Sequence, residues 1–183
     1  AGQTTGSVTF DNPNSEDVYV DNSTETYTII DSSGGNYVSL DTSDSSVVTI
    51  TDTETPVTVD LTASTVNENG SDTSYVFTAT LEKPSQGKTT IVTDKGTIEI
   101  LDGQTTGTLT ITSNQTEDVY LDASELTATI TSATGGNFES LVVGNASATA
   151  KVTDTTNEVK VNLTASTVNE NGSDTSYVFT ATL

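Results

Sequence analysis

Acidic side chains recur in one spacing at two places along the chain. Glu117, Asp118 and Asp122 form the pattern Glu-Asp-x-x-x-Asp, and the same pattern starts at Glu16. Calcium takes about six to eight oxygen ligands from carboxylates, carbonyls and water, so this pattern offers the ligand type that calcium needs. The alternative is that these acids only solvate a loop, and the positions of the other acids decide between the two interpretations.

The composition leaves little room for other chemistry. The chain of 183 residues has no Cys and no His, which removes the best zinc ligands and the usual nucleophile–base pairs. Its 26 acidic and five basic residues give a net charge of −21, which excludes nucleic-acid binding and repels an anionic membrane. Paired carboxylates could serve a glycosidase, but nothing indicates a cleft with aromatic walls. We expect no enzyme activity, no nucleic-acid partner and no direct membrane contact.

The chain repeats itself with a period of about 100 residues, which is the size of a small domain rather than of a solenoid unit. LTASTVNENGSDTSYVFTATL occurs at Leu61–Leu81 and again, unchanged, at Leu163–Leu183. GQTTG, EDVY and GGN also occur twice, in the same order. The expected frame is the back part of one domain at residues 1–53, a whole domain at 54–155, and the front of a third at 156–183.

Short alternating strands fill each repeat. Apolar and polar residues alternate at 57–63 and 75–81, and again at 109–111, 126–130 and 148–152. A period of two with one apolar face is typical of half-buried strands, and turn-forming segments separate these runs. The pattern predicts an all-β fold of tandem immunoglobulin-like Greek-key β-sandwich domains.

Reversal of direction from strand to strand collects the acids at one pole of the central domain. The loops 64–72 and 113–125, the turn 93–96 and the end of the last strand meet there. These segments carry Glu68, Asp72, Asp94, Glu117, Asp118, Asp122, Glu125 and Asp154. Two unit charges about 4 Å apart repel by roughly 4 kcal/mol at an effective dielectric constant near 20, and calcium converts that repulsion into ligation. The convergence predicts calcium binding at this pole. The EKPSQGK, LDGQ and TGGNFES loops lie at the opposite pole.

The sequence resembles the extender repeats of giant repeats-in-toxin bacterial adhesins, which include LapA-type biofilm adhesins and an ice-binding adhesin. GQTTGTLTI, EDVYLD, ATGGNFESL and the closing KVTDT carry the resemblance in this order, and it spans the whole chain. STVNENG also matches the V-x-E-x-G pattern of Calx-β domains, which is a weaker signal.

The resemblance implies a calcium-rigidified β-sandwich in a long extracellular stalk, exported by type I secretion and folded in external calcium. Matching by motif places calcium contacts on two sets of acids: Glu117, Asp118, Asp122 and Asp154, and Glu16, Asp17, Asp21 and Asp52. Glu68 and Asp72 complete the candidate set. The family often has Gly-Gly after the Glu of this first loop, whereas this chain has Asn69-Gly70.

The functional hypothesis is a structural extender of a calcium-dependent adhesin on the bacterial cell surface. Its partners are the neighbouring repeats of a surface-anchored protein, and calcium stiffens the junctions so that a distal binding domain is projected. The alternative is an adhesin binding module that recognises a glycan or a protein through an exposed loop. Tyr120, which follows the acidic pair, is expected to pack its ring at the base of its loop.

Overall fold

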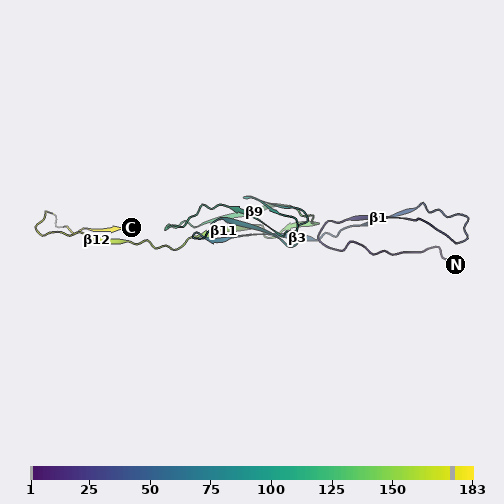
Figure 1. Ribbon diagram of the computed structural model, residues 1–183, viewed down its shortest axis with the longest axis horizontal. Coiled ribbons are helices and arrows are strands. Elements are labelled where there is room, and N and C mark those ends of the chain that lie inside the picture. The colour runs from purple at the N-terminus through teal and green to yellow at the C-terminus, as the bar shows by residue number, and fades with distance from the viewer. Residues whose placement is uncertain (1, 174–175) are drawn as a thin grey trace. The chain divides into compact units, whose positions relative to one another are not determined.

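The computed structural model describes residues 2–173 and 176–183. Ala1 and residues 174–175, which fall within the expected pieces 1–53 and 156–183, lie outside the described residues. The described residues form thirteen strands and no helix, so the all-β prediction is confirmed (Figure 1). Consequently, no described segment has the long apolar helix that a membrane crossing by helices requires.

The strands are numbered from the N-terminus. Their bounds are β1 (Ser23–Thr28), β2 (Ser45–Ile50), β3 (Pro56–Ala63), β4 (Thr65–Asn67), β5 (Tyr75–Leu81), β6 (Thr89–Thr93), β7 (Gly96–Ile100), β8 (Thr106–Ile111), β9 (Ser124–Gly135), β10 (Ser140–Val143), β11 (Ser147–Thr153), β12 (Asn162–Ala165) and β13 (Phe179–Thr182). Each range in which the sequence alternates lies within one of these strands, so the period-two prediction is confirmed.

The chain divides into two compact units. The first unit consists of residues 1–62, 77–109 and 128–148. The second unit consists of residues 63–76, 110–127 and 149–183.

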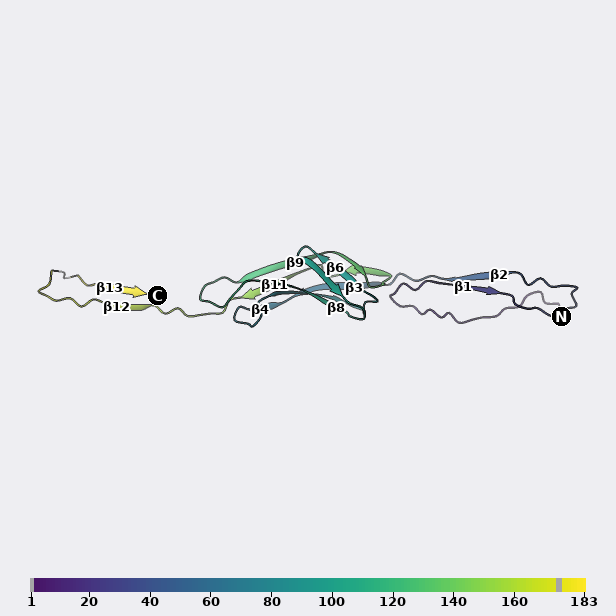
Figure 2. The same ribbon diagram turned by 45° about the horizontal axis from the view of Figure 1, so that its top comes forward.

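Two sheets carry most of the strands. One sheet has the order β10-β3-β5-β8, and the other has the order β4-β11-β9-β6-β7. Within the first unit, β6 and β9 belong to one layer and β3 and β8 to the other (Figure 2), which is consistent with the predicted β-sandwich. The sequence did not indicate β4 and β10, which are short strands that pair in parallel with β11 and β3.

Alternate side chains of the strands form the core. In the first unit Val57, Val59 and Leu61 of β3 and Phe77 of β5 are fully buried. Burial of a side chain of this size contributes about 1.5–3 kcal/mol to folding. In the second unit Val152 of β11 is buried in the same way. The residues between them point outwards, as the sequence pattern predicts.

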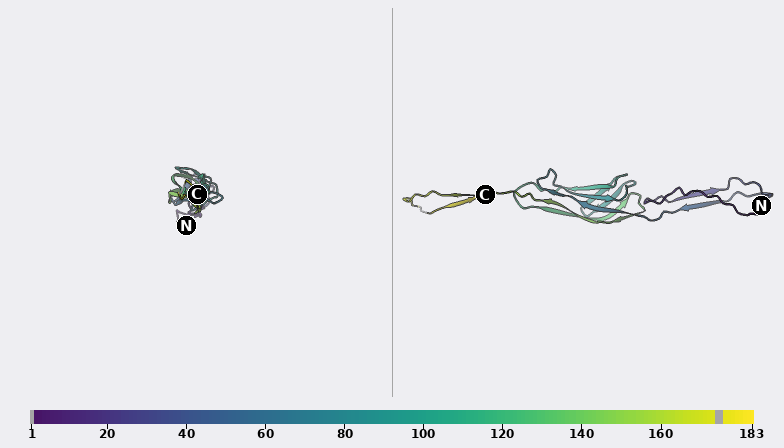
Figure 3. Two further views of the ribbon diagram at one scale, coloured as in Figure 1. Left: turned by 90° about the vertical axis from the view of Figure 1, so that its left-hand side faces the viewer. Right: turned by 90° about the horizontal axis from the view of Figure 1, so that it is seen from below.

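The remaining strands form two-stranded sheets that bury little. β1 pairs with β2 and β12 with β13, both antiparallel (Figure 3). Nearly every side chain of these four strands is exposed. Two-stranded units are marginally stable in water. The stability of the described chain therefore resides mainly in the two larger sheets.

The loops expected at the pole opposite the acids do meet, in the first unit. Gly103 donates its N–H to Ser85 O at 2.8 Å, and Gln86 donates its N–H to Gly136 O at 3.1 Å. These bonds join the EKPSQGK, LDGQ and TGGNFES segments, so this part of the pole prediction is confirmed.

Candidate metal centre

Three carboxylates from separate segments of the second unit lie together. One carboxylate oxygen each of Glu68, Asp122 and Asp154 lies within 4.8 Å of the other two. All three belong to the acids that the sequence places at one pole. The structure therefore forms a compact acidic cluster, called here the Glu68 cluster.

The parallel pairing of β4 with β11 positions two of these acids. Asn67 lies opposite Thr153 at the ends of the two strands, and Glu68 donates its N–H to Thr153 O at 3.0 Å. Glu68 and Asp154 each follow immediately, so both leave the sheet at the same edge. Asp122 joins them from the loop between β8 and β9. Its N–H donates to Asp154 Oδ1 at 3.3 Å.

The acids also hold the chain that leaves the cluster. Thr155 donates its N–H to Glu68 Oε1 at 2.7 Å and its hydroxyl to Glu117 Oε2 at 2.9 Å. Asn157 donates its side-chain amide to the Glu117 carboxylate and to Asp118 O. Five acidic residues of the candidate set thus either belong to the cluster or hold the residues that follow it.

Burial and like charge act on Glu68. The hydrogen bond from Thr155 lowers the pKa of Glu68. Burial acts in the opposite direction, as do the charges of three carboxylates, and the pKa of Glu68 is raised above its ordinary value; these carboxylates are Asp154, Glu117 and Asp122. Among the described residues, the lysines that form ion pairs do so with Glu99, Asp94 and Glu125 and not with this cluster.

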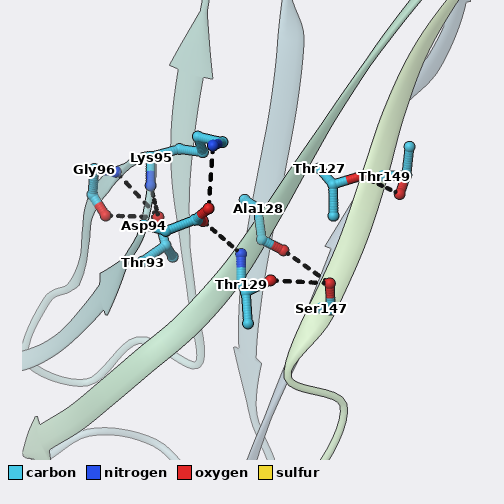
Figure 4. Close-up of polar contacts among 9 residues, drawn as sticks. All are labelled: Thr93, Asp94, Lys95, Gly96, Thr127, Ala128, Thr129, Ser147 and Thr149. Carbon is cyan, nitrogen blue, oxygen red and sulfur yellow. Dashed lines mark hydrogen bonds and ion pairs between the residues drawn. The ribbon is translucent and has the colours of Figure 1, made fainter.

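Two acids expected at the same pole are engaged elsewhere. Asp72 accepts the N–H of Ser74 at 2.9 Å, which lowers the pKa of Asp72. Asp94 accepts the N–H of Thr129 at 2.8 Å and pairs with Lys95 at 3.1 Å (Figure 4). Neither is part of the group of described carboxylates close enough to share an ion.

The first unit contains a second acidic cluster, called here the Asp21 cluster. Asp21 donates its N–H to Asp52 Oδ2 at 2.9 Å, and Asp52 donates its N–H to Asn22 Oδ1 at 2.9 Å. A hydrogen bond with the Asp52 side chain raises the pKa of Asp21. Burial and the charges of Asp52, Asp17 and Glu139 add to this effect. Asp21 and Asp52 are therefore joined by a hydrogen bond, and the charges of Asp17 and Glu139 act on Asp21.

Sequence reasoning missed Glu139, which lies near the Asp21 cluster. Glu139 Oε2 accepts the N–H of Thr55 at 2.7 Å, and Thr55 donates its hydroxyl to Glu16 Oε1 at 2.8 Å. The sequence assigned the GGNFE loop to the pole with few acids, which is correct within its own repeat. The missed signal is the order of the repeats, since that pole meets the acidic end of the repeat before it.

The expectation for Tyr120 is wrong. Its side chain is 74% exposed, and only its N–H is held, by Asp118 Oδ1 at 2.6 Å. The counterpart Tyr19 stacks on Phe138 with ring centroids 5.5 Å apart. The physical reason is that the ring of Tyr19 packs against Phe138 in the following sequence copy, and not against the base of the loop that carries Tyr19.

The donor set fits a hard divalent cation. One carboxylate oxygen each of Glu68, Asp122 and Asp154 lies within 4.8 Å of the other two, and carboxylate oxygens are ligands that calcium prefers. A buried carboxylate among like charges is unfavourable unless a cation neutralises it. Oxygen alone, with no nitrogen or sulfur ligand, disfavours zinc. Glu68, Asp122 and Asp154 would hold the ion in the second unit.

Comparison with known proteins assigns this sequence pattern to a family. A family model described as the LapA domain matches residues 1–53 and residues 55–155. No curated protein matches the chain. The matched residues include the acids of both clusters. Asn157, which contacts Glu117, lies outside the matched range.

Proposed function

The chain belongs to the LapA domain family and is thereby related to biofilm adhesins, and from this premise we propose that it is an extender segment of a calcium-dependent adhesin on a bacterial surface. In this proposal each repeat is a spacer. Calcium at the acidic clusters stiffens the connection between successive repeats, so that a distal binding domain is held away from the cell.

The observation that supports this proposal best is the way in which Thr55 is held. Its N–H donates to Glu139 and its hydroxyl to Glu16. These acids come from two sequence copies, and Thr55 lies in the segment that joins them. Neighbouring domains move relative to one another by default unless their junction is fixed. A clamped connecting residue is what a spacer needs.

The second unit makes the corresponding contact. Thr155 donates to Glu68 and to Glu117, and Asn157 donates to Glu117 as well. The connecting residues after each acidic cluster are therefore held by carboxylates in both units. Without an ion those carboxylates repel one another. A bound calcium ion would neutralise the repulsion and, because it is ligated by several carboxylates at once, would hold their segments together.

Distance measurements between spin labels test this proposal. The chain has no native cysteine, so Glu25→Cys on β1 and Thr110→Cys on β8 give two exposed labelling sites. We expect the distribution of label-to-label distances to be broad in chelator and to narrow in millimolar calcium, because free carboxylates repel and bound ones are fixed.

The control is the same labelled chain carrying Asp21→Asn and Asp52→Asn. Its distance distribution is expected to stay broad in calcium, because the Asp21 cluster has lost two charged ligands. Equal widths in chelator and in calcium for the unsubstituted chain would refute calcium stiffening.

A further inference from the structure

A contact between uncharged groups joins the two sequence copies in the first unit. Residues 18–20 of the first copy lie antiparallel to residues 137–139 of the second, with Tyr19 opposite Phe138. Two backbone hydrogen bonds of 2.9 and 3.0 Å close this pair, and the two rings stack with their centroids 5.5 Å apart. We call this contact the tyrosine junction.

Side-chain hydrogen bonds add to the tyrosine junction. The Tyr19 hydroxyl donates to Pro84 O at 2.7 Å. The side-chain amide of Asn137 donates to Gln86 Oε1 at 2.9 Å and to Val20 O at 3.4 Å. All of these donors and acceptors are neutral, so none of them needs a cation in order to form its bond. Salt screens charges, and it leaves contacts between neutral groups largely unaffected.

The part of the second copy that Tyr19 contacts is supported by buried polar groups. Ser85 and Thr89 are both buried, and their hydroxyl oxygens lie 2.6 Å apart. Ser85 also donates its N–H to Gln104 O at 2.9 Å and accepts the N–H of Gly103 at 2.8 Å. Bonds within the second copy therefore fix the loop that accepts the Tyr19 hydroxyl.

The loop that carries Phe138 is shaped in advance as well. Gly135, Gly136 and Asn137 have φ values of 95, 79 and 55°, in the left-handed region that glycine adopts readily and asparagine tolerates. A Cβ on Gly136 would lie 2.4 Å from Thr89 Oγ1 and equally close to the Phe138 ring. Glycine is therefore required for the ring to lie where it meets the first copy.

The turn of the first copy is held by its own side chain, since Tyr19 donates its N–H to Asp17 Oδ1 at 2.6 Å. Both sides of the tyrosine junction are thus held by bonds within their own copy. Contact between preformed segments loses little conformational entropy.

Like charge opposes the joining of the two copies. The pKa of Asp21 is raised first by a hydrogen bond with Asp52, and the charge of Glu139 contributes to the rise. Glu139 directly follows Phe138 on one side of the junction, and Asp21 lies two residues after Tyr19 on the other. Without an ion, the copies stay joined only if uncharged contacts outweigh this repulsion.

We propose that the tyrosine junction couples the two sequence copies without calcium, and that the second copy there holds the Asp-Val-Tyr segment of the first. The coupling goes beyond the proposed role of calcium and does not depend on it. A single contact still lets the copies bend about it, so an ion bound nearby can add stiffness to copies that are already joined.

Hydrogen exchange of the two backbone N–H groups that cross the junction tests the proposal. Val20 donates its N–H to Asn137 O, and Glu139 donates its N–H to Val18 O. Both groups exchange slowly only while the copies are joined. The exchange rates are measured by NMR on the whole isotope-labelled chain in chelator, so that calcium cannot contribute. Rates that stay the same on dilution are expected, because the contact lies within one chain.

Tyr19→Ala removes the ring stack and the hydrogen bond to Pro84. We expect the Val20 and Glu139 N–H groups to exchange at least about tenfold faster in this variant, because stacking and a hydrogen bond are both lost. Tyr19→Phe keeps the ring and loses only the hydrogen bond, so a smaller acceleration is expected.

The matched control is Tyr27→Ala. Tyr27 stacks on Phe10 within the first copy, with ring centroids 5.1 Å apart, and takes no part in the tyrosine junction. We expect the Val20 and Glu139 N–H groups to keep their slow exchange in this variant.

An internal reference shows whether each variant is folded. Leu81 donates its N–H to Thr105 O at 2.8 Å within the second copy, and its exchange should be equally slow in all of the chains. Equal exchange of the junction groups in the unsubstituted and Tyr19→Ala chains would overturn the proposal, as would equal acceleration in Tyr19→Ala and Tyr27→Ala. Slow exchange that appears only when calcium is added would overturn it too, and would leave calcium stiffening intact.

Discussion

The two copies of Glu-Asp-x-x-x-Asp form the same turn but meet different surroundings. In each copy the Asp carboxylate holds the N–H of the tyrosine two residues later at 2.6 Å. The ring of Tyr19 then stacks on Phe138, in the loop at residues 135–139, whereas Tyr120 is exposed. The local sequence therefore sets the turn, and the packing of the tyrosine depends on a loop that is distant in the sequence.

The clusters also differ in the glutamate that completes them. Glu68, from the first loop of the same repeat, joins the second-unit cluster. In the first unit the pKa of Asp21 is raised mainly by Asp52 and also by the charges of Asp17 and of Glu139, which belongs to the following sequence copy. The two clusters therefore have their glutamates on different segments, Glu68 after β4 and Glu139 before β10.

The largest expected effect comes from removing a shared ligand of the Glu68 cluster. A ligand at 100 times its dissociation constant stabilises the folded state by about 2.7 kcal/mol. Asp154→Asn is expected to remove most of that calcium-dependent stabilisation from the second unit, as measured by denaturant unfolding in calcium and in chelator. Glu158→Gln removes one charge four residues later in the sequence without altering a cluster residue, and it should keep the calcium response. A full calcium response in Asp154→Asn would exclude this cluster as the binding site.

Removing the tyrosine ring tests the difference between the two copies directly. Aromatic stacking contributes about 0.5–1.5 kcal/mol beyond burial, and a hydrogen bond adds about 0.5–1.5 kcal/mol. Tyr19→Ala is therefore expected to lower the free energy of unfolding by about 2 kcal/mol in chelator. Tyr120→Ala is expected to change it by less than about 0.5 kcal/mol, as exposed substitutions do. Similar losses in both variants would mean that Tyr120 is also packed.

A smaller effect concerns the pH dependence of the calcium-free protein. Because the pKa of Glu68 is raised on folding from 4.5, the folded state binds more protons than the unfolded state above that pH. Stability therefore decreases as the pH rises through the window from 4.5 to the raised value. Glu68→Gln keeps an acceptor for Thr155 and removes the charge. We expect the variant to gain melting temperature relative to the unsubstituted chain as the pH rises from 4 to 7 in chelator, and a constant difference would refute the account.

The smallest effect is expected at Asp94, a carboxylate that lies outside both clusters and therefore serves as a control. Its pKa is lowered from 3.8, first by the N–H of Thr129 and then by Lys95 (Figure 4). Its stabilising contribution is therefore present above 3.8 and is lost as the pH falls through the lowered value. Asp94→Asn is expected to cost little at neutral pH, because an exposed ion pair contributes little to stability. The loss of stability should vanish near pH 2 and should not depend on calcium. Melting curves at neutral pH and near pH 2, each in calcium and in chelator, check both points.

The sequence predicts the strands and much of the Glu68 cluster because both depend on local patterns. Alternation identifies β3 and β5, and strand reversal brings Glu68 and Asp154 to one pole. Glu139 and the burial of Tyr19 could not be predicted in this way, since both depend on contacts between successive copies. Asp72 lies outside the Glu68 cluster and holds the N–H of Ser74 in its own turn, which proximity in sequence does not reveal.

Thermal unfolding of the unsubstituted chain in chelator and in millimolar calcium tests the central claim most directly. Extracellular calcium sites commonly have dissociation constants of about 10⁻⁴–10⁻³ M, so millimolar calcium should occupy both clusters. We predict a clear rise in melting temperature with calcium, because carboxylates fixed in position by the fold bind the ion better than the unfolded chain does. Identical melting curves in chelator and in calcium would contradict it.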